Sequence, residues 1–324
     1  MASGIRARFA ALAIFGTLFA SWAQAQEYPT KEIHAVCSYA AGSGADILVR
    51  YYSDKLAKLA GKPVIVENRA GAQGLIGTEY AAHAKPDGYT ILVLPASSTL
   101  AAAPFLFKKL PYDPFKDFTP VAPISSLNFV IAVEGRSTVK TVADLIAEMK
   151  KKPDNGSYGI SNNTAQVAGE VFKEMSGLKS VLVPYTTIAP AVTDMLGGRL
   201  DYIVGDATFM AGQVKSGRVR VIAVTGSRRS GSMPDVPTMM ESGFPGFDIS
   251  AWWGVVAPAG TPKPIVDKLA GWIAQINASE ETRQFLFTNA TDVLNGTPES
   301  MTAMLKQDYE RWARYTKVAR IEPQ

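Results

Sequence analysis

The segment Tyr39-Ala40-Ala41-Gly42-Ser43-Gly44-Ala45-Asp46 lies between two different hydrophobic patterns. An apolar run, 33–37, precedes it, and an amphipathic pattern with helical spacing follows over 45–59. This order predicts a strand, a loop of small residues and a helix. Small side chains leave the loop backbone open to a ligand, and the first N–H groups of a helix favour negative charge. The segment therefore predicts a cradle for an anion.

A second segment, Glu67-Asn68-Arg69-Ala70-Gly71-Ala72-Gln73-Gly74, repeats this pattern. A predicted strand over 63–67 precedes it and a predicted helix over 74–84 follows. Two helix N-termini from adjacent units can point at one small anion. The alternative is that both loops are tight turns whose glycines serve only backbone geometry. The occurrence of two such loops in succession favours the anion site.

Composition predicts a well-packed protein that does not bind nucleic acid. The chain has 324 residues, enough for two domains, with 47% hydrophobic and 19% charged residues. The formal net charge is +4, and the tight basic groups are 150–152 and Arg228-Arg229. Neither group forms a basic stripe with interleaved aromatic residues, which argues against a nucleic-acid interface. Both groups are expected to be solvated surface.

The N-terminus has the features of a signal peptide. Arg6 and Arg8 precede an apolar run over 9–19, and Ala23-Gln24-Ala25 matches a cleavage site. We expect residues 1–25 to be removed, which predicts an exported, soluble mature chain without a lipid anchor. Cys37 is the only cysteine, so no internal disulfide is expected, and its place in a predicted strand favours buried packing.

Alternating strands and helices predict an α/β protein with two mainly parallel sheets flanked by helices. The predicted strands are 33–37, 63–67, 90–94, 129–133, 157–160, 180–184, 201–205, 219–224 and 252–256. The predicted helices are 45–59, 74–84, 141–150 with Thr141 as N-cap, 164–176, 188–197, 208–215, one beginning at Thr261-Pro262 with proline at N1, and 299–318. On the last helix Met301, Met304, Leu305, Trp312 and Tyr315 share one face, and its aromatic residues are expected to be core and not a ligand site.

Two irregular stretches predict that the chain crosses between domains twice. Pro104 to Pro123 is rich in proline and is expected to contain no regular helix, and Gly226 to Ser250 reads as loop. Domain 1 is therefore predicted as 26–127 plus 249–324, and domain 2 as 128–248. Ligands of open α/β sheets lie beyond the carboxyl ends of the strands, so both domains are expected to direct their loops into a shared cleft.

Sequence patterns for catalysis are sparse. Gly42-Ser43-Gly44 lacks the outer glycines of a nucleophile elbow, and the two histidines, His34 and His83, are not expected at the cleft. Neither a dinucleotide fingerprint nor a Walker A sequence is present, and two separated histidines with one cysteine do not predict a metal site. We expect no cofactor.

Polar residues follow several predicted strands. Hydroxyl, amide and backbone N–H groups suit recognition of a carboxylate without a charged partner. The residues in question are Ser97, Ser98 and Thr99, then 161–164, then Tyr185, Thr186 and Thr187, and finally Asp206. Asp206 has two interpretations, contact with a ligand or capping of the next helix.

Short motifs along nearly the whole mature chain resemble the Bug/TctC family, the periplasmic solute-binding proteins of tripartite tricarboxylate transporters. The similarity includes the opening run 28–33 and both cradle loops. Further matching motifs are Pro86-Asp87-Gly88-Tyr89-Thr90, Val183-Pro184-Tyr185, 196–201, 234–238, Trp253-Gly254 and 257–262. Together these matches are specific, although no single one is.

The resemblance implies a two-domain Venus-flytrap fold, a periplasmic location and no catalysis. It implies that both first-domain loops hold one ligand carboxylate and that second-domain residues close over the distal end. The expected ligand-binding residues are Tyr39, Ala41, Gly42, Ser43, Gly44, Ala45, Asp46, Gly71, Ala72, Gln73, Gly74, Ser97, Ser98, Ser161, Asn162, Asn163, Thr164, Tyr185, Thr186 and Asp206. The implied partners are a small carboxylate and the membrane permease subunits of the transporter, and the chain is expected to be a monomer.

Two departures from the family pattern concern specificity. Ser43 adds a hydroxyl to the first loop, and Thr186-Thr187 replaces a lysine–glycine pair after Tyr185, which favours a less charged or aromatic ligand body. Tyr39, Tyr185 and Phe209 agree with an aromatic body, although packing explains each of them as well. The sequence does not name the ligand. A sensory co-receptor that binds a sensor-kinase ectodomain, and an enzyme on the same scaffold, are the alternative functions.

Overall fold

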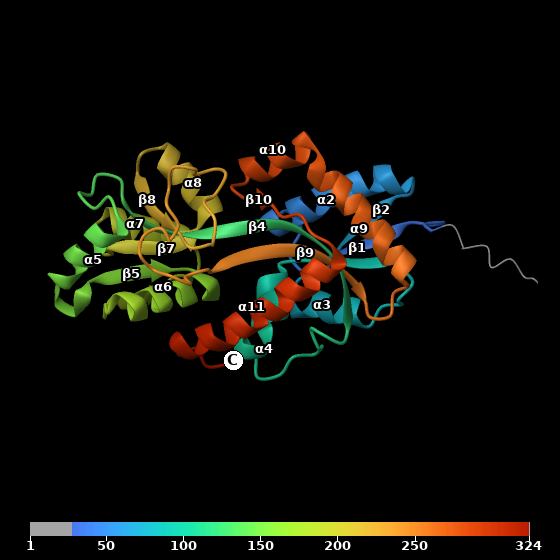
Figure 1. Ribbon diagram of the computed structural model, residues 1–324, viewed down its shortest axis with the longest axis horizontal. Helices are drawn as coiled ribbons and strands as arrows, with labels where there is room; N and C mark the ends of the chain where they lie inside the picture. Colours follow the sequence, from blue (N-terminus) through green and yellow to red (C-terminus); the bar gives the residue numbers. More distant parts are fainter. Residues whose placement is uncertain (1–27, 324) are drawn as a thin grey trace, which may run out of the picture.

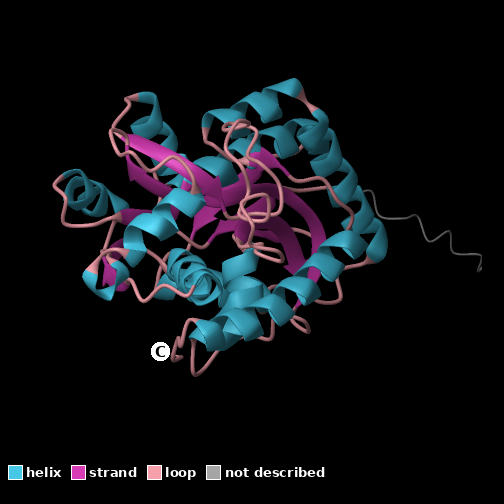
Figure 2. Cartoon of the chain, turned by 60° about the vertical axis from the view of Figure 1, so that its left-hand side comes forward, coloured by secondary structure: helices cyan, strands magenta, loops and turns pink. Residues whose placement is uncertain are grey.

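The computed structural model describes residues 28–323, so the predicted signal peptide lies outside the described residues. Strands in the described part form one mixed sheet in the order β2-β1-β3-β9-β4-β7-β5-β6, and β10 and β8 also pair with β4. Helices cover both faces of this sheet (Figures 1 and 2). Within residues 28–323, no helix combines the length and the apolarity needed to cross a bilayer.

The elements have the following bounds. The strands are β1 Ile33–Cys37, β2 Val64–Asn68, β3 Thr90–Leu94, β4 Phe118–Glu134, β5 Ser157–Ile160, β6 Val181–Pro184, β7 Tyr202–Asp206, β8 Val219–Val224, β9 Ser250–Pro258 and β10 Asp292–Val293. The helices are α2 Gly44–Ala60, α3 Leu75–Ala82, α4 Ala103–Leu106, α5 Val142–Lys150, α6 Asn163–Ser176, α7 Ile188–Leu196, α8 Ala207–Lys215, α9 Lys263–Ala278, α10 Glu280–Thr288 and α11 Pro298–Val318. Short helical turns are η1 Ala72–Gly74, η2 Ser97–Ala102 and η3 Pro153–Asn155.

The sheet has two lobes that meet at β4 and β9. In the first lobe β1 pairs in parallel with β2 and β3, and in the second lobe β5 pairs in parallel with β6 and β7. The long strands β4 and β9 run antiparallel to each other between the lobes. The expectation of mainly parallel sheets therefore holds for the flanks, whereas the centre of the sheet is antiparallel. Strand β9 carries the chain back from the second lobe and runs antiparallel to both β3 and β4.

Strand β4 differs most from the sequence prediction, because it covers seventeen residues and not only 129–133. The proline-rich stretch was predicted to be irregular up to Pro123, yet Pro120 and Pro123 lie inside this strand. The register with β9 shifts between Pro120 and Ala122 and again between Pro123 and Ser125. Irregularities of this kind accept proline because the ladder needs no N–H donor there. Pro104, in turn, lies in the first turn of α4, where a missing N–H costs little.

The predicted crossing points lie next to each other in the structure. Asn128 of β4 pairs with Ser250 of β9, so the two connections between lobes are adjacent strands. The domain limits 26–127 plus 249–324, and 128–248, remain a prediction. They place both crossings between the lobes next to the Asn128–Ser250 pair.

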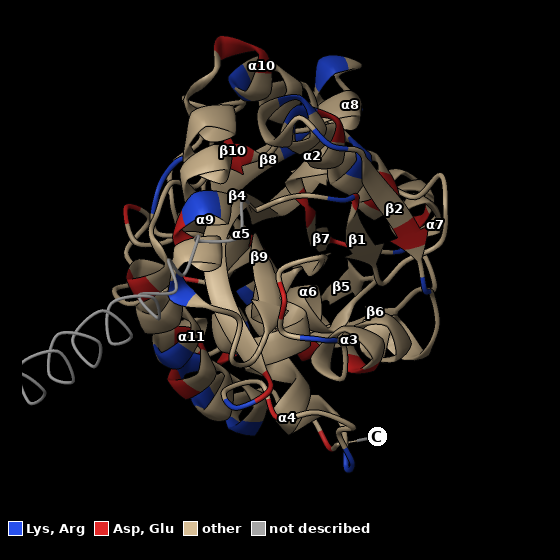
Figure 3. Ribbon diagram, turned by 90° about the vertical axis from the view of Figure 1, so that its right-hand side faces the viewer, with Lys and Arg blue, Asp and Glu red and all other residues tan. Residues whose placement is uncertain are grey.

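The C-terminal helix α11 connects the lobes on one face of the sheet. It packs on η2, β4 and α6, and Figure 1 shows it running along the underside of the sheet. Trp312 and Tyr315 on its inner face are almost fully buried. Figure 3 shows acidic and basic residues interspersed along α11.

Helix ends agree with the capping signals in the sequence. Thr141 caps α5 and its hydroxyl accepts from the N–H of Asp144, as predicted. The prediction of proline at N1 of α9 was wrong, because Pro262 is the N-cap and Pro264 lies in the first turn. Helix α10 and strand β10 had no sequence prediction.

Candidate functional site

The first predicted cradle loop leads into α2 and caps that helix with its own side chains. The Ser43 hydroxyl accepts from the N–H of Asp46 at 3.2 Å, and the Asp46 carboxylate accepts from the N–H of Gly42 at 2.8 Å. These two bonds tie the loop to the first turn of α2. Ala45, in the first turn of α2, lines the cavity described below.

Asp46 is buried and connects the two cradle loops. Arg50 Nε donates to its Oδ2 at 2.9 Å, and Asn68 Nδ2, at the end of β2, donates to its Oδ1 at 2.8 Å. The hydrogen bond from Arg50, together with those from Gly42 and Asn68, lowers the pKa of Asp46 to about 2. Asn68 also donates to the Tyr39 carbonyl at 3.0 Å. The Asp46 carboxylate therefore bonds to groups of α2 and of the two cradle loops, and Asp46 does not line the cavity.

The second cradle loop has a left-handed backbone at successive residues. Ala72 and Gln73 have φ values of 45° and 54°, and Gly74 has a φ of 95°. Positive φ is uncommon for residues other than glycine and is held only where the surroundings fix it. Thr78 Oγ1 donates to the Gly74 carbonyl at 2.8 Å, which anchors the loop to α3. Gln73, within this loop, lines the cavity.

The loop after β3 adds hydroxyl groups. Ser98 and Thr99 line the cavity, and Ser98 Oγ donates to the Pro95 carbonyl at 3.1 Å. Ser97 does not line it, because Ser97 is buried and its hydroxyl accepts from the backbone N–H of Trp252 at 3.3 Å. Both serines were predicted to bind the ligand, but in the structure only Ser98 of the two lines the cavity.

The second lobe contributes the N-terminus of α6. Asn162 caps this helix, because its Oδ1 accepts from the N–H of Ala165 at 2.9 Å. Ser161, Asn162, Asn163 and Thr164 all line the cavity. The predicted strand–polar loop–helix arrangement of the second domain therefore faces the loops of the first lobe.

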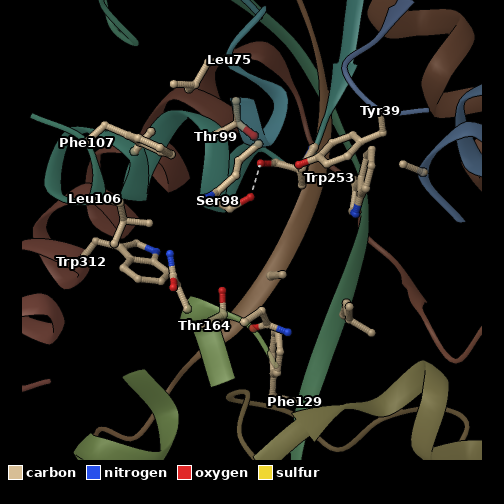
Figure 4. Close-up of a pocket in the computed structure, with 18 of the residues that line it drawn as sticks. Tyr39, Leu75, Ser98, Thr99, Leu106, Phe107, Phe129, Thr164, Trp253 and Trp312 are labelled. Atoms are coloured by element: carbon tan, nitrogen blue, oxygen red, sulfur yellow. Dashed lines mark hydrogen bonds between the residues drawn. The ribbon is translucent and has the colours of Figure 1, made fainter. Parts of the chain in front are cut away.

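These segments surround a cavity of about 570 Å³ between the lobes (Figure 4). None of the described residues that line it is charged. The polar lining residues are Tyr39, Gln73, Ser98, Thr99, Ser161, Asn162, Asn163 and Thr164. The apolar ones include Leu106, Phe107, Leu127, Phe129, Trp253 and Trp312. Such a surface can offer N–H, hydroxyl and amide donors to an anion, and apolar walls to the rest of a ligand.

Other predicted residues lie outside this lining. Those of the cradle loops are Ala41, Gly42, Ser43, Gly44, Asp46, Gly71, Ala72 and Gly74, which form the loop backbones beside the lining residues Ala45 and Gln73. In the second lobe, the Tyr185 hydroxyl donates to Asp194 Oδ2 at 2.8 Å, and Thr186 is exposed. Asp206 accepts from the N–H of Phe209 at 2.8 Å and is the N-cap of α8, so the structure shows the capping interpretation.

Tyr39 was expected at the site and lines the cavity, but the sequence did not identify the other aromatic walls. Trp312 was expected to be core, and it is only 2% exposed, yet it also lines the cavity. Trp253 follows Trp252 in β9, and alternation along the strand puts the two indoles on opposite faces. Trp252 donates to Asp308 of α11 at 2.9 Å, whereas Trp253 lines the cavity. This alternation was the signal that could have found Trp253.

Within residues 28–323, the structure contains no group of three or more histidine, cysteine, aspartate or glutamate residues that could hold a metal ion. His34 lies away from the cavity, with Nδ1 at 2.6 Å from Glu67 Oε1. The helix N-termini, hydroxyls and amides of the cavity lining are groups that can bind an anion.

Comparison with known proteins gives consistent matches. The family model described as "Tripartite tricarboxylate transporter family receptor", TctC, matches residues 48–320. Protein BugT of Bordetella pertussis is 31% identical over 292 residues, 89% of this chain and 89% of that protein. The periplasmic binding protein BugD is 34% identical, with a TM-score of 0.72 over 92% of this chain and all of that chain.

A ligand-bound structure is also similar. Rpa4515 of R. palustris, solved with adipate, is 30% identical, with a TM-score of 0.77 over 92% of this chain and all of that chain. These structures confirm the periplasmic-binding-protein fold that the sequence predicted. The chain therefore belongs to the TctC, or Bug, family of solute receptors of tripartite tricarboxylate transporters.

Proposed function

We propose that this protein captures a small carboxylate in the cavity between its lobes and delivers it to the membrane subunits of a tripartite tricarboxylate transporter. The observation that carries the proposal is the convergence of α2, α3 and α6 on one cavity whose described lining is uncharged. Unpaired N–H groups and the helix dipole favour an anion at each of these ends.

The cradle supports a specific docking mode. A carboxylate that lies between the start of α2, near Ala45, and the loop around Gln73 can accept charge-assisted hydrogen bonds from backbone N–H groups. Thr99 supplies a hydroxyl at the same wall. The relative Rpa4515 is described with adipate, a dicarboxylate, which supports a carboxylate as the class of ligand.

In this proposal, the two lobes rotate toward each other and enclose the ligand. Rotation about the adjacent β4 and β9 strands would bring Ser161–Thr164 of the second lobe over a ligand held by the first lobe. The closed form is the one that a permease would recognise. We place the mature chain, 26–324, in the periplasm as a monomer.

A thermal-shift screen of the mature chain tests the proposal. A ligand at about 100 times its Kd adds roughly 2.7 kcal/mol to the unfolding free energy, which corresponds to a shift of several degrees. We expect at least one small carboxylate to produce this shift. If protein freed of co-purified ligand by unfolding and refolding shows no shift with any acid of a broad panel, the proposal is wrong.

A further inference from the structure

Aromatic side chains stand on opposite sides of the cavity. Figure 4 shows Phe107 and Trp312 on one side, and Tyr39 and Trp253 on the other. The rings of Tyr39 and Trp253 lie 6.4 Å apart between centroids at an interplanar angle of 49°. Aromatic rings prefer offset or tilted packing with centroids about 4.5–7 Å apart. These four aromatic residues border the cavity from two sides, so a flat apolar body can lie between them.

The cations nearest to the cradle loops are already paired. Arg50 donates to Asp46 and, at 2.9 Å, to the side-chain oxygen of Asn68. Arg69 donates to Glu67, and its guanidinium lies 3.4 Å from the centroid of the Tyr80 ring. Neither arginine is among the residues that line the cavity. Among the described residues, a ligand meets only neutral groups there.

Some hydrogen-bonding groups in the cavity wall of the second lobe already bond to residues of the same lobe. The Asn162 side chain already accepts a hydrogen bond from the N–H of Ala165, in the first turn of α6. Phe129 and Leu127 beside it are apolar. A second carboxylate at this wall would meet the α6 N-terminus and neutral amides but no cationic partner, so the cost of its lost water is offset only in part.

Resting on the carboxylate site proposed above, we propose that the ligand is an aromatic monocarboxylate. Its carboxylate faces the cradle of the first lobe, and its ring lies between the Phe107–Trp312 pair and the Tyr39–Trp253 pair. The hydroxyls and amides of 161–164 then face the far edge of the ring, where they can bind a neutral polar substituent.

Calorimetry on the mature chain tests this ligand class. The probes are benzoate, phenylacetate and 2-naphthoate, compared with adipate, malate and citrate. We expect the tightest aromatic acid to bind at least tenfold more tightly than the tightest aliphatic di- or tricarboxylate. Tighter binding of an aliphatic polyacid overturns the aromatic assignment and leaves the carboxylate site intact. Binding of none of the six acids overturns the aromatic assignment, and only failure of the broad panel also removes the carboxylate site.

Two neighbouring phenylalanines provide matched variants. Phe107, the C-cap of α4, lines the cavity, whereas Phe105, inside α4, packs against Tyr309 with ring centroids 4.7 Å apart. Loss of one aromatic contact weakens binding by about three- to tenfold. We expect Phe107→Leu to show this loss for the aromatic acid, and Phe105→Leu to bind as the unchanged protein does. Equal affinities of the two folded variants would contradict the placement of the ring.

Discussion

Asn68 Nδ2 donates to Asp46 Oδ1 at 2.8 Å, and this bond joins the end of β2 to the first turn of α2. The same amide group donates to the Tyr39 carbonyl at 3.0 Å. Each cradle loop therefore fixes the position of the other before a ligand arrives. A preformed site loses less entropy on binding than a mobile one.

Asp46→Asn should destabilise the protein at neutral pH. The pKa of Asp46 falls from 3.8 to about 2 in the folded state, so its contribution is present above pH 3.8 and is lost as the pH falls toward 2. We expect a loss of roughly 1–2 kcal/mol at pH 7, because exposure of Arg50 screens part of the pair.

Urea unfolding at pH 7 measures this loss. Asp54→Asn, which breaks an exposed pair with Lys58 on the same helix, is the control and should change the unfolding free energy little. Equal effects of the two substitutions would contradict the role given to Asp46.

Asp308→Asn should change how stability depends on pH. Burial raises the pKa of Asp308 from 3.8 to about 6. The folded state therefore favours the protonated form, and this contribution is present below pH 3.8 and is lost as the pH rises through 6. The asparagine oxygen can still accept from the Trp252 indole, which lies 2.9 Å from the carboxylate.

The unfolding free energy of the unchanged protein, relative to Asp308→Asn, should fall by at most about 3 kcal/mol between pH 3.5 and 7. Asp267→Asn, at an exposed pair with Lys263, serves as control and should keep the original profile. A parallel pH profile for Asp308→Asn and the unchanged protein would contradict the assigned pKa shift.

Gly74→Ala should distort the second cradle loop. The φ of 95° at Gly74 is unfavourable for alanine, and an added Cβ would lie 3.4 Å from Ser38 Cβ and from the Tyr39 hydroxyl. We expect a loss of about 1–3 kcal/mol in stability and weaker ligand binding. Gly212→Ala, in α8 with open space around it, should leave both unchanged or slightly raise stability. Thermal unfolding measures the stability of both variants, and calorimetry measures their ligand affinity. Unaltered ligand binding by Gly74→Ala would contradict the role given to this loop.

Thr99→Val should weaken carboxylate binding without unfolding the protein. The change keeps the side-chain shape but removes a hydroxyl that lines the cavity. Loss of one hydrogen bond to a charged group costs about 1.5–3 kcal/mol, or more than tenfold in Kd. Thr193→Val, on α7, removes a hydroxyl that bonds the Ala189 carbonyl away from the cavity and should not alter Kd. An unchanged Kd in Thr99→Val would exclude this hydroxyl from the site.

Local signals in the sequence predicted most elements well, because caps and periodicity act over a few residues. Asn162 and the small residues before α2 marked the two helix starts that face the cavity. The long antiparallel pair of β4 and β9 could not be predicted, since its prolines read as breakers and only bulges against the partner strand accommodate them. Trp312 was missed for a related reason. Periodicity shows that a helix face is buried, but not that part of it borders a cavity.

The most direct test of the central claim compares one acid with its amide. The acid that gives the largest thermal shift and its primary amide have nearly the same shape, and only the acid is negative. Because helix N-termini hold the carboxylate in this account, calorimetry should show the amide binding at least tenfold more weakly at the same salt concentration. Equal affinity of acid and amide would contradict the account, since the site would then recognise the body of the ligand and not its charge.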